Sequence, residues 1–468
     1  MLKSILANKV FKNFSYLTLG TVLSQILSLI TVLKITNILK PDDYGLYTFI
    51  IAQGALLVTI ADLGIQTIIV RAISRDNDRT NDLVINGIYL RLIALILVSG
   101  IYILYNYFLG ELDALELFYL FCFSLITCIG KLYEIVFIGF QRMLPTSVIN
   151  FLFSFFWFAA VFILPSELMT VSSLMVIYLF INLLKNFTYY LVLRKLGMLI
   201  GKVSGFLESS TALIKESWPY FALTLVMLPY RRFANNFLDI NSSIEEVGFY
   251  NLSEKFTGPI SMVLDIGLIA IFPNLSSLWV SNREKFIKVV KTGFRYYMLL
   301  GGILAFLFTM FAHEILTILF PPEYLPAVIV CQIQIWFLLL SSIDSLVGTV
   351  LGATNNEKRI FQLGLVNSII STPIIFYGSF YGAFGLSVAY LITFALFQFY
   401  IWYIFQKYVN INIDKKILTW GVLLSLFGLS YFLFSDFGVF LKIILSLFFL
   451  SVSVYLILGR KTFLSWRS

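Results

Sequence analysis

The chain has 468 residues, of which 59% are hydrophobic and only 12% are charged, and its net charge is +8. Soluble globular proteins carry about 25% charged residues, so this composition excludes a water-soluble protein and indicates that lipid is the solvent. Because the excess of basic residues belongs to a membrane protein, it does not indicate nucleic-acid binding, and we expect no nucleic-acid partner. Three cysteines in apolar runs and one histidine, His313, predict neither a disulfide framework nor a metal or cofactor site.

Runs of about 20 apolar residues are long enough to cross a bilayer as helices. These runs are continuously apolar and do not alternate, which favours helices over a β-barrel. The sequence therefore predicts an all-α integral membrane protein of about fourteen helices, at 14–35, 44–65, 83–108, 115–138, 146–165, 171–193, 216–241, 247–273, 294–320, 325–351, 360–380, 382–406, 416–435 and 437–458.

Basic residues are concentrated in every second segment between these spans. With the N-terminus inside, the outer segments contain only Lys34 and Lys40, whereas inner segments such as 71–79 and 407–416 are basic. The positive-inside rule then predicts a multi-pass protein with both termini in the cytoplasm. Segment 283–295 is expected to be either a short basic amphipathic helix on the inner surface or a plain loop.

One stretch of the sequence occurs twice. An acidic turn with Gly45 is followed by Asp62, and both are matched by Gly248 and Asp265 without a gap, at a shift of about 203 residues. The shift covers six predicted crossings, so the copies face the same way and form a parallel repeat with a site between the halves. The predicted parts are a six-helix lobe at 1–195, an inter-lobe cytoplasmic linker at 196–215, a second six-helix lobe at 216–407, and helices 13 and 14 with a tail at 408–468.

Several basic residues fall within the predicted spans, where a charge costs about 2.5–3.5 kcal/mol and usually faces a wet cavity or the bundle interior. Lys442 is near the end of its helix, so we expect it to snorkel to the interface. The Arg231–Arg232 doublet suits a polyanion such as a pyrophosphate. The candidate binding residues are Arg91, Lys131, Lys185, Arg231, Arg232, Lys255, Asn235 and Asn236.

Structural ion pairs are the alternative interpretation of these charges. Lys131 and Glu134 are three residues apart, and Arg232 and Asp239 are seven apart, so each pair would share a helix face. The intramembrane carboxylates are candidates for coupling or gating, with H⁺ or Na⁺ as the coupling ion, although a helix-end role is open for the matched pair Asp62 and Asp265. These candidates are Asp62, Asp265, Glu254 and Asp344.

Several segments resemble the polysaccharide (O-antigen type) flippases of the multidrug/oligosaccharidyl-lipid/polysaccharide exporter superfamily. They are YGLY, ADLG and RAISR in the first half and EEVGFYNLSEKF, FPNLSSL, ILFPPEYLPAVIV and YGAFGLSVAY in the second. The resemblance covers most of the chain. It implies fourteen helices in two six-helix lobes plus a terminal pair that lines a groove for a lipid tail.

The same resemblance implies a function in the bacterial cytoplasmic membrane. A relative of these flippases would move undecaprenyl-pyrophosphate-linked oligosaccharide from the inner to the outer leaflet by alternating access, without ATP, for surface polysaccharide assembly. The family's central cationic cavity would here be formed by Lys131, Lys185, Arg231, Arg232 and Lys255. A polysaccharide polymerase and a chain-length regulator would be partners.

Three other functions stay open. A lipid II exporter of the same fold would also meet a pyrophosphate, whereas a drug exporter for cations should have an acidic cavity. A membrane polysaccharide polymerase or ligase would need catalytic groups on a long outer loop, and the predicted outer loops are short.

No GxxxxGK[ST] pattern occurs, so ATP hydrolysis is not expected. We expect a secondary transporter and not an enzyme.

Overall fold

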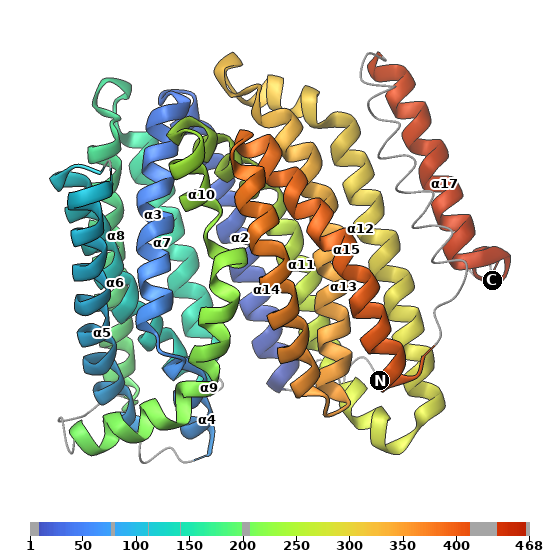
Figure 1. Cartoon of the computed structure of the whole chain (residues 1–468), viewed down its shortest axis with the longest axis horizontal. Coiled ribbons are helices and arrows are strands. Elements are labelled where there is room, and N and C mark those ends of the chain that lie inside the picture. The colour runs from blue at the N-terminus through green and yellow to red at the C-terminus, as the bar shows by residue number, and fades with distance from the viewer. Residues whose placement is uncertain are drawn as a thin grey trace. The chain divides into compact units, whose positions relative to one another are not determined.

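The computed structural model describes residues 9–75, 80–110, 112–140, 142–198, 206–411 and 438–464. Every regular element in these ranges is a helix, which agrees with the predicted all-α fold. The chain divides into two compact units, Met1–Gly248 and Phe249–Ser468, and Figure 1 shows the long helices of each unit side by side.

The first unit contains the helices up to α10 and the first turn of α11. Its helices are α2 (Lys9–Thr36), α3 (Pro41–Ala61), α4 (Ile65–Arg75), α5 (Thr80–Leu109), α6 (Ala114–Gly139), α7 (Met143–Ile163), η1 (Ser166–Leu168), α8 (Val171–Lys195), α9 (Phe206–Arg232) and α10 (Ala234–Asn241). α3, α5 and α8 pack on α6, and α2 packs on α7. α9 packs on α4 and α5, and α10 packs on α3. Segment 216–241 thus packs with the first compact unit, and the division into two six-helix lobes with a linker at 196–215 stays a prediction.

The second unit contains the rest of the described chain. Its helices are α11 (Ile244–Ser281), α12 (Arg283–Leu319), η2 (Pro322–Tyr324), α13 (Ala327–Ala353), α14 (Glu357–Ser379), α15 (Gly382–Val409) and α17 (Val439–Leu464). α13 packs on α12, α14 and α15, and α14 packs on α15. In the first unit α6 packs in the same way on α5, α7 and α8, and α7 packs on α8. The helix pairing thus repeats between the halves, as the duplicated sequence predicts.

Ten helices in the described part of the chain are long and apolar enough to cross a membrane. Their outward side chains also require an apolar solvent, because Leu97, Ile101 and Phe108 of α5 are 64%, 69% and 73% exposed and water would disfavour such a surface. Predicted span 416–435 lies outside the described residues. The number fourteen therefore stays a prediction.

The second predicted span, 44–65, ends differently from expectation. α3 stops at Ala61, and the chain turns through Leu63 and Gly64, both with positive φ. A Cβ at Gly64 would lie 2.8 Å from the backbone nitrogen of Phe221 in α9, so this turn also needs a glycine for close packing. The residues beyond it, expected as a loop, form the amphipathic helix α4, whose buried face includes Ile69 and Ile73.

Two further predictions are corrected by helix boundaries. Span 216–241 is not one helix, because α9 ends at Arg232 and α10 begins at Ala234. Segment 283–295 is neither a separate surface helix nor a loop, because it is the continuous start of α12. Its apolar side chains explain this, since Phe286 and Phe294 are buried in one cluster with Phe405 of α15, while Lys285 and Lys288 are exposed.

Candidate functional site

An ion pair joins Asp62, at the end of α3, to Arg91 of α5. Arg91 Nη2 lies 2.9 Å from Asp62 Oδ1, and Arg91 is fully buried. Arg91 Nε and Nη1 have no hydrogen-bond partner among the described residues. The structure thus brings together a predicted binding residue and a predicted gating residue, and it leaves guanidinium donors of a buried cation unused.

Lys131 of α6 lies close to this pair. It is half-buried and is within electrostatic range of Arg91, Arg232, Asp62 and Glu134. Lys131 and Arg232 form no ion pair with any residue that the structure describes, in contrast to Arg91. Cations therefore outnumber carboxylates in this part of the first unit. We call these five residues, Asp62, Arg91, Lys131, Glu134 and Arg232, the cationic cluster.

Glu134 is held in place by side chains from two other helices. Its Oε1 accepts a hydrogen bond from Asn150 Nδ2 of α7 at 2.8 Å and lies 3.0 Å from the hydroxyl of Tyr189 in α8. The Tyr189 hydroxyl is also 3.0 Å from Asn150 Oδ1, so it can donate to only one of the two oxygens at a time. These bonds fix a carboxylate beside Lys131, one turn away on the same helix face.

Lys185 borders the same network. Its Nζ is 5.9 Å from the centroid of the Tyr189 ring, a cation–π distance, and Glu134 is the carboxylate that acts on it electrostatically. Lys185 has no ion pair in the described part of the chain. The structure therefore places both Lys185 and Lys131 within electrostatic range of one anchored carboxylate.

The arginine doublet lies in the last turn of α9, where cations favour the helix C-terminus. Both arginines are exposed, and Arg231 Nε donates to the Tyr230 hydroxyl at 3.0 Å. Because α9 ends here, the seven-residue spacing from Arg232 to Asp239 does not run along one helix. Arg232 is within electrostatic range of Lys131.

The two predicted asparagines belong to α10. Asn236 Nδ2 donates to Gln53 Oε1 of α3 at 2.9 Å, and Asn235 is buried. The amide of Asn236 therefore connects α10 to α3. Its role as a ligand of a substrate stays a prediction.

The remaining candidates belong to the second unit. Lys255 of α11 is half-buried and is influenced by the neighbouring Glu254. Asp344 of α13 accepts a hydrogen bond from Gln398 Nε2 of α15 at 2.6 Å. Asp265 lies in α11, and its side chain is outside the described structure. The roles predicted for Lys255, Glu254, Asp344 and Asp265 stay predictions.

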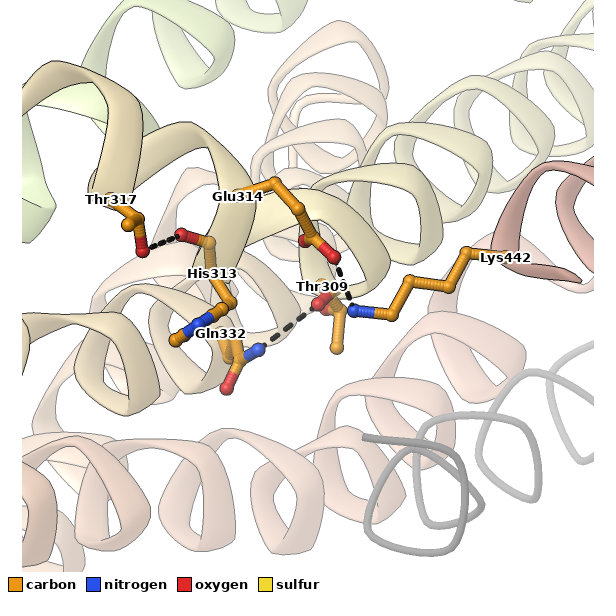
Figure 2. A network of polar contacts seen from close by, with 6 residues as sticks. All are labelled: Thr309, His313, Glu314, Thr317, Gln332 and Lys442. Carbon is orange, nitrogen blue, oxygen red and sulfur yellow. Dashed lines mark hydrogen bonds and ion pairs between the residues drawn. The ribbon is translucent and has the colours of Figure 1, made fainter. Parts of the chain in front are cut away.

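Lys442 of α17 does not snorkel, which corrects the sequence-based expectation. Figure 2 shows its side chain directed at Glu314 of α12, with Lys442 Nζ 2.6 Å from Glu314 Oε1. Lys442 is 2% exposed. In the same view Gln332 Nε2 of α13 donates to the backbone oxygen of Thr309 at 3.1 Å. A charge near a helix end can thus be buried when a neighbouring helix supplies its partner.

Sequence reasoning missed the carboxylate anchor and both ion pairs. Spacing along one helix can indicate that Lys131 and Glu134 share a face, and that Lys185 and Tyr189 do. It cannot show that Asn150 and Tyr189 meet at Glu134, because those contacts join three different helices.

Comparison with known proteins supports a transporter. The model of the polysaccharide biosynthesis protein family matches residues 10–279, more than half of the chain. A "putative O-antigen transporter" of Escherichia coli (strain K12) is 26% identical over 178 residues, which are 38% of this chain and 43% of that relative. The matched region thus spans less than half of the relative's length.

Solved structures of transporters share the fold. A "lipid II flippase MurJ" in an inward closed conformation has a TM-score of 0.73 at 13% identity, over 94% of this chain and 98% of that one. An inward-facing "multidrug resistance MATE family transporter of the MOP superfamily" has a TM-score of 0.62 at 11% identity, over 82% and 96%. These relatives are transporters and not enzymes. The chain is a multi-pass membrane protein with the fold of the MOP superfamily, and it belongs to the polysaccharide biosynthesis protein family.

Proposed function

We propose that the protein is a flippase for undecaprenyl-pyrophosphate-linked oligosaccharide. It would move this substrate from the inner to the outer leaflet of the bacterial cytoplasmic membrane by alternating access, for surface polysaccharide assembly. The family and the named O-antigen transporter relative support the class of cargo. The predicted cytoplasmic termini, the H⁺ or Na⁺ coupling, and the polymerase and chain-length regulator as partners are expectations of the same proposal.

The cationic cluster is the observation that carries the proposal. Lys131 and Arg232 are close enough to influence each other electrostatically and have no ion pair among the described residues, so together they raise the positive potential around the half-buried Lys131. Two opposite charges about 4 Å apart attract by about 4 kcal/mol at the effective dielectric of a protein surface. A pyrophosphate would therefore be attracted here, whereas an organic cation would be repelled.

Guanidinium donors give the cluster a second property that suits this cargo. Arg91 is buried with unused nitrogens, and arginine binds phosphate oxygens with directed hydrogen bonds. Glu134 would hold Lys131 and Lys185 near the cluster, because it attracts both and is itself fixed by Asn150 and Tyr189. The anchored carboxylate would thus keep both lysine side chains close to one fixed position.

Surface glycan in a strain that lacks its own oligosaccharide flippase provides the test. The wild-type chain should restore surface glycan, and replacing Lys131 and Arg232 together by Ala should lower it by at least about tenfold, since each 1.4 kcal/mol of lost binding is a factor of ten. Arg194→Ala with Lys195→Ala is the matched control, because it removes two cations from the last turn of α8. Equal glycan in both double variants, at equal protein level, would contradict the proposal.

Lipid II is the second candidate cargo, because the lipid II flippase shares the fold and that lipid also carries a pyrophosphate. A strain depleted of its lipid II flippase separates the two. Rescue of growth there, without restored glycan in the first strain, would assign the protein to lipid II.

A further inference from the structure

Two cations meet one aromatic ring at the end of α15. The guanidinium of Arg359, in the first turn of α14, lies 4.1 Å from the centre of the Tyr408 ring, and Lys407 Nζ lies 5.8 Å from the same centre. Lys407 Nζ is also 5.6 Å from the centre of the Tyr403 ring, one turn earlier in α15. These are cation–π distances, so the two rings gather two positive charges in one small region.

Arg359 is fixed in this position by side-chain hydrogen bonds. Its Nη1 donates to Gln362 Oε1 at 2.8 Å, and Gln362 Nε2 donates to the hydroxyl of Tyr400 in α15 at 3.0 Å. Within the described ranges, neither Arg359 nor Lys407 has an ion pair, and Arg359 makes no hydrogen bond through Nε or Nη2. The cations are favoured at the C-terminal end of a helix, yet no carboxylate of the described chain neutralises them, and donors of a held guanidinium stay available.

An exposed apolar face of α15 leads to these cations. Leu396, Phe399 and Tyr403 are three and four residues apart, and Lys407 continues the same spacing, so all four share one face of the helix. Phe399 is 79% exposed. In a bilayer such a face contacts acyl chains, and a tyrosine near its end suits the interface. The surface is therefore apolar along the helix and positive at its end, as an amphiphilic anion requires.

The cations also lie at one end of the second unit. Figure 1 shows the start of α14 and the end of α15 at the same end of that unit. The distribution of basic residues in the sequence predicts that this end faces the cytoplasm. Basic pockets between membrane helices on this side of a bilayer bind anionic lipid headgroups.

We propose that Arg359 and Lys407 bind the phosphate of an anionic phospholipid, whose acyl chains lie along Leu396, Phe399 and Tyr403. Arg359 would donate directed hydrogen bonds to the phosphate oxygens, and Lys407 would add a point charge. A zwitterionic lipid offers the same acyl chains but carries its own cation, so the site should select lipids by the net charge of the headgroup. The inference goes beyond the proposed function, because this lipid belongs to the surrounding membrane and is not the cargo.

Native mass spectrometry of the purified full chain in detergent tests the site. The probe is phosphatidylglycerol, and phosphatidylcholine with the same acyl chains is the reference without net charge. The wild type should bind the first phosphatidylglycerol molecule more tightly than phosphatidylcholine. Arg359→Gln with Lys407→Gln should weaken phosphatidylglycerol binding by about tenfold or more and leave phosphatidylcholine binding unchanged.

Lys285→Gln with Lys288→Gln is the matched control. It removes the same charge from the start of α12, from two side chains that are exposed, and it should weaken phosphatidylglycerol binding by less than about twofold. If the Arg359 variant does not fold, Lys407→Gln alone gives the same comparison, because Lys407 is exposed. Equal losses in the variant and the control, or equal wild-type affinity for the two lipids, would overturn the proposal.

Undecaprenyl pyrophosphate separates this site from the cationic cluster. Its binding should be unchanged in the Arg359→Gln, Lys407→Gln protein, and phosphatidylglycerol binding should be unchanged when Lys131 and Arg232 are replaced by Ala. Loss of both lipids in the Arg359→Gln, Lys407→Gln protein would overturn the inference, because the site would then belong to the cargo. If the wild type binds no undecaprenyl pyrophosphate, the proposed function fails, while the comparison of phosphatidylglycerol with phosphatidylcholine still decides this inference.

Discussion

Charge is matched differently at the contact of α12 with α17 in the second unit and in the cationic cluster of the first unit. In the second unit, Lys442 is matched one to one with Glu314 across α17 and α12. Among the described residues of the first unit, Arg91 is matched by Asp62, whereas the half-buried Lys131 and Lys185 and the exposed Arg232 have no ion pair. A matched pair is expected to hold helices together, whereas unmatched cations cost stability and are retained for a ligand. Stability and transport should therefore respond to different residues.

The largest effect on stability is expected at the second unit's pair. Glu314→Ala would leave Lys442 buried without a partner and should cost about 3–5 kcal/mol, measured as a fall in melting temperature in detergent. Exchanging the charges, with Glu314→Lys and Lys442→Glu together, should recover much of the loss. If Glu314→Ala melts like the wild type, this pair does not anchor α17.

Replacing Lys131 should affect ligand binding more than stability, the opposite of what is expected for Glu314. Lys131→Ala removes a cation that other cations repel, so the melting temperature should stay equal or rise slightly. Binding of a pyrophosphate lipid should weaken by about tenfold or more, as for the loss of about 1.4 kcal/mol. Thermal melting and lipid binding, measured on the same preparation, check the expected stability and the expected affinity. A strongly destabilised Lys131→Ala protein would contradict the contrast between Lys131 and the Lys442–Glu314 pair.

The carboxylate anchor should show an intermediate effect. Tyr189→Phe removes the hydroxyl beside Glu134 and Asn150 but keeps the ring beneath Lys185. Loss of one hydrogen bond to a charged group should cost about 1.5–3 kcal/mol, seen as a lower melting temperature. Thr188→Val is the control, because Thr188 is a neighbour whose hydroxyl bonds only within its own helix. Equal melting of the two variants would mean that the Tyr189 hydroxyl does not anchor Glu134.

The smallest effect is expected from Glu245, outside the spans. Burial and the carboxylates of Asp42 and Glu246 raise its pKa, so Glu245 binds its proton more tightly in the folded protein than in the unfolded chain. Its contribution to stability is complete below the unfolded pKa of about 4.3 and is lost as the pH rises through the folded pKa. Glu245→Gln should flatten this pH dependence and slightly raise the melting temperature at neutral pH. An unchanged pH profile would contradict the raised pKa.

Much of the fold could be predicted, because apolar runs and their period report directly on lipid-exposed helices. The duplication around Gly45 and Gly248 predicted a repeat, and the same helix pairing does recur in the two units. The helix boundaries were harder, since the break at Phe233 lies inside the stretch 216–241, whose apolar content predicted a single span.

The site could be predicted only as a set of charges. A sequence shows that Arg91, Lys131 and Arg232 are costly in lipid, but not that Asp62 neutralises only the first of them. Lys442 shows the same limit, because its partner Glu314 lies 128 residues away. Partner choice depends on contacts between helices that local spacing cannot specify.

Binding of undecaprenyl pyrophosphate to the purified protein is the most direct test of the central claim, that the cationic cluster receives a pyrophosphate. We predict that the wild type binds it, that Lys131→Ala and Arg232→Ala each weaken binding by about tenfold or more, and that the charge-exchanged Glu314→Lys, Lys442→Glu protein binds like the wild type. Equal affinity in the wild type and the Lys131→Ala, Arg232→Ala double variant would contradict the account.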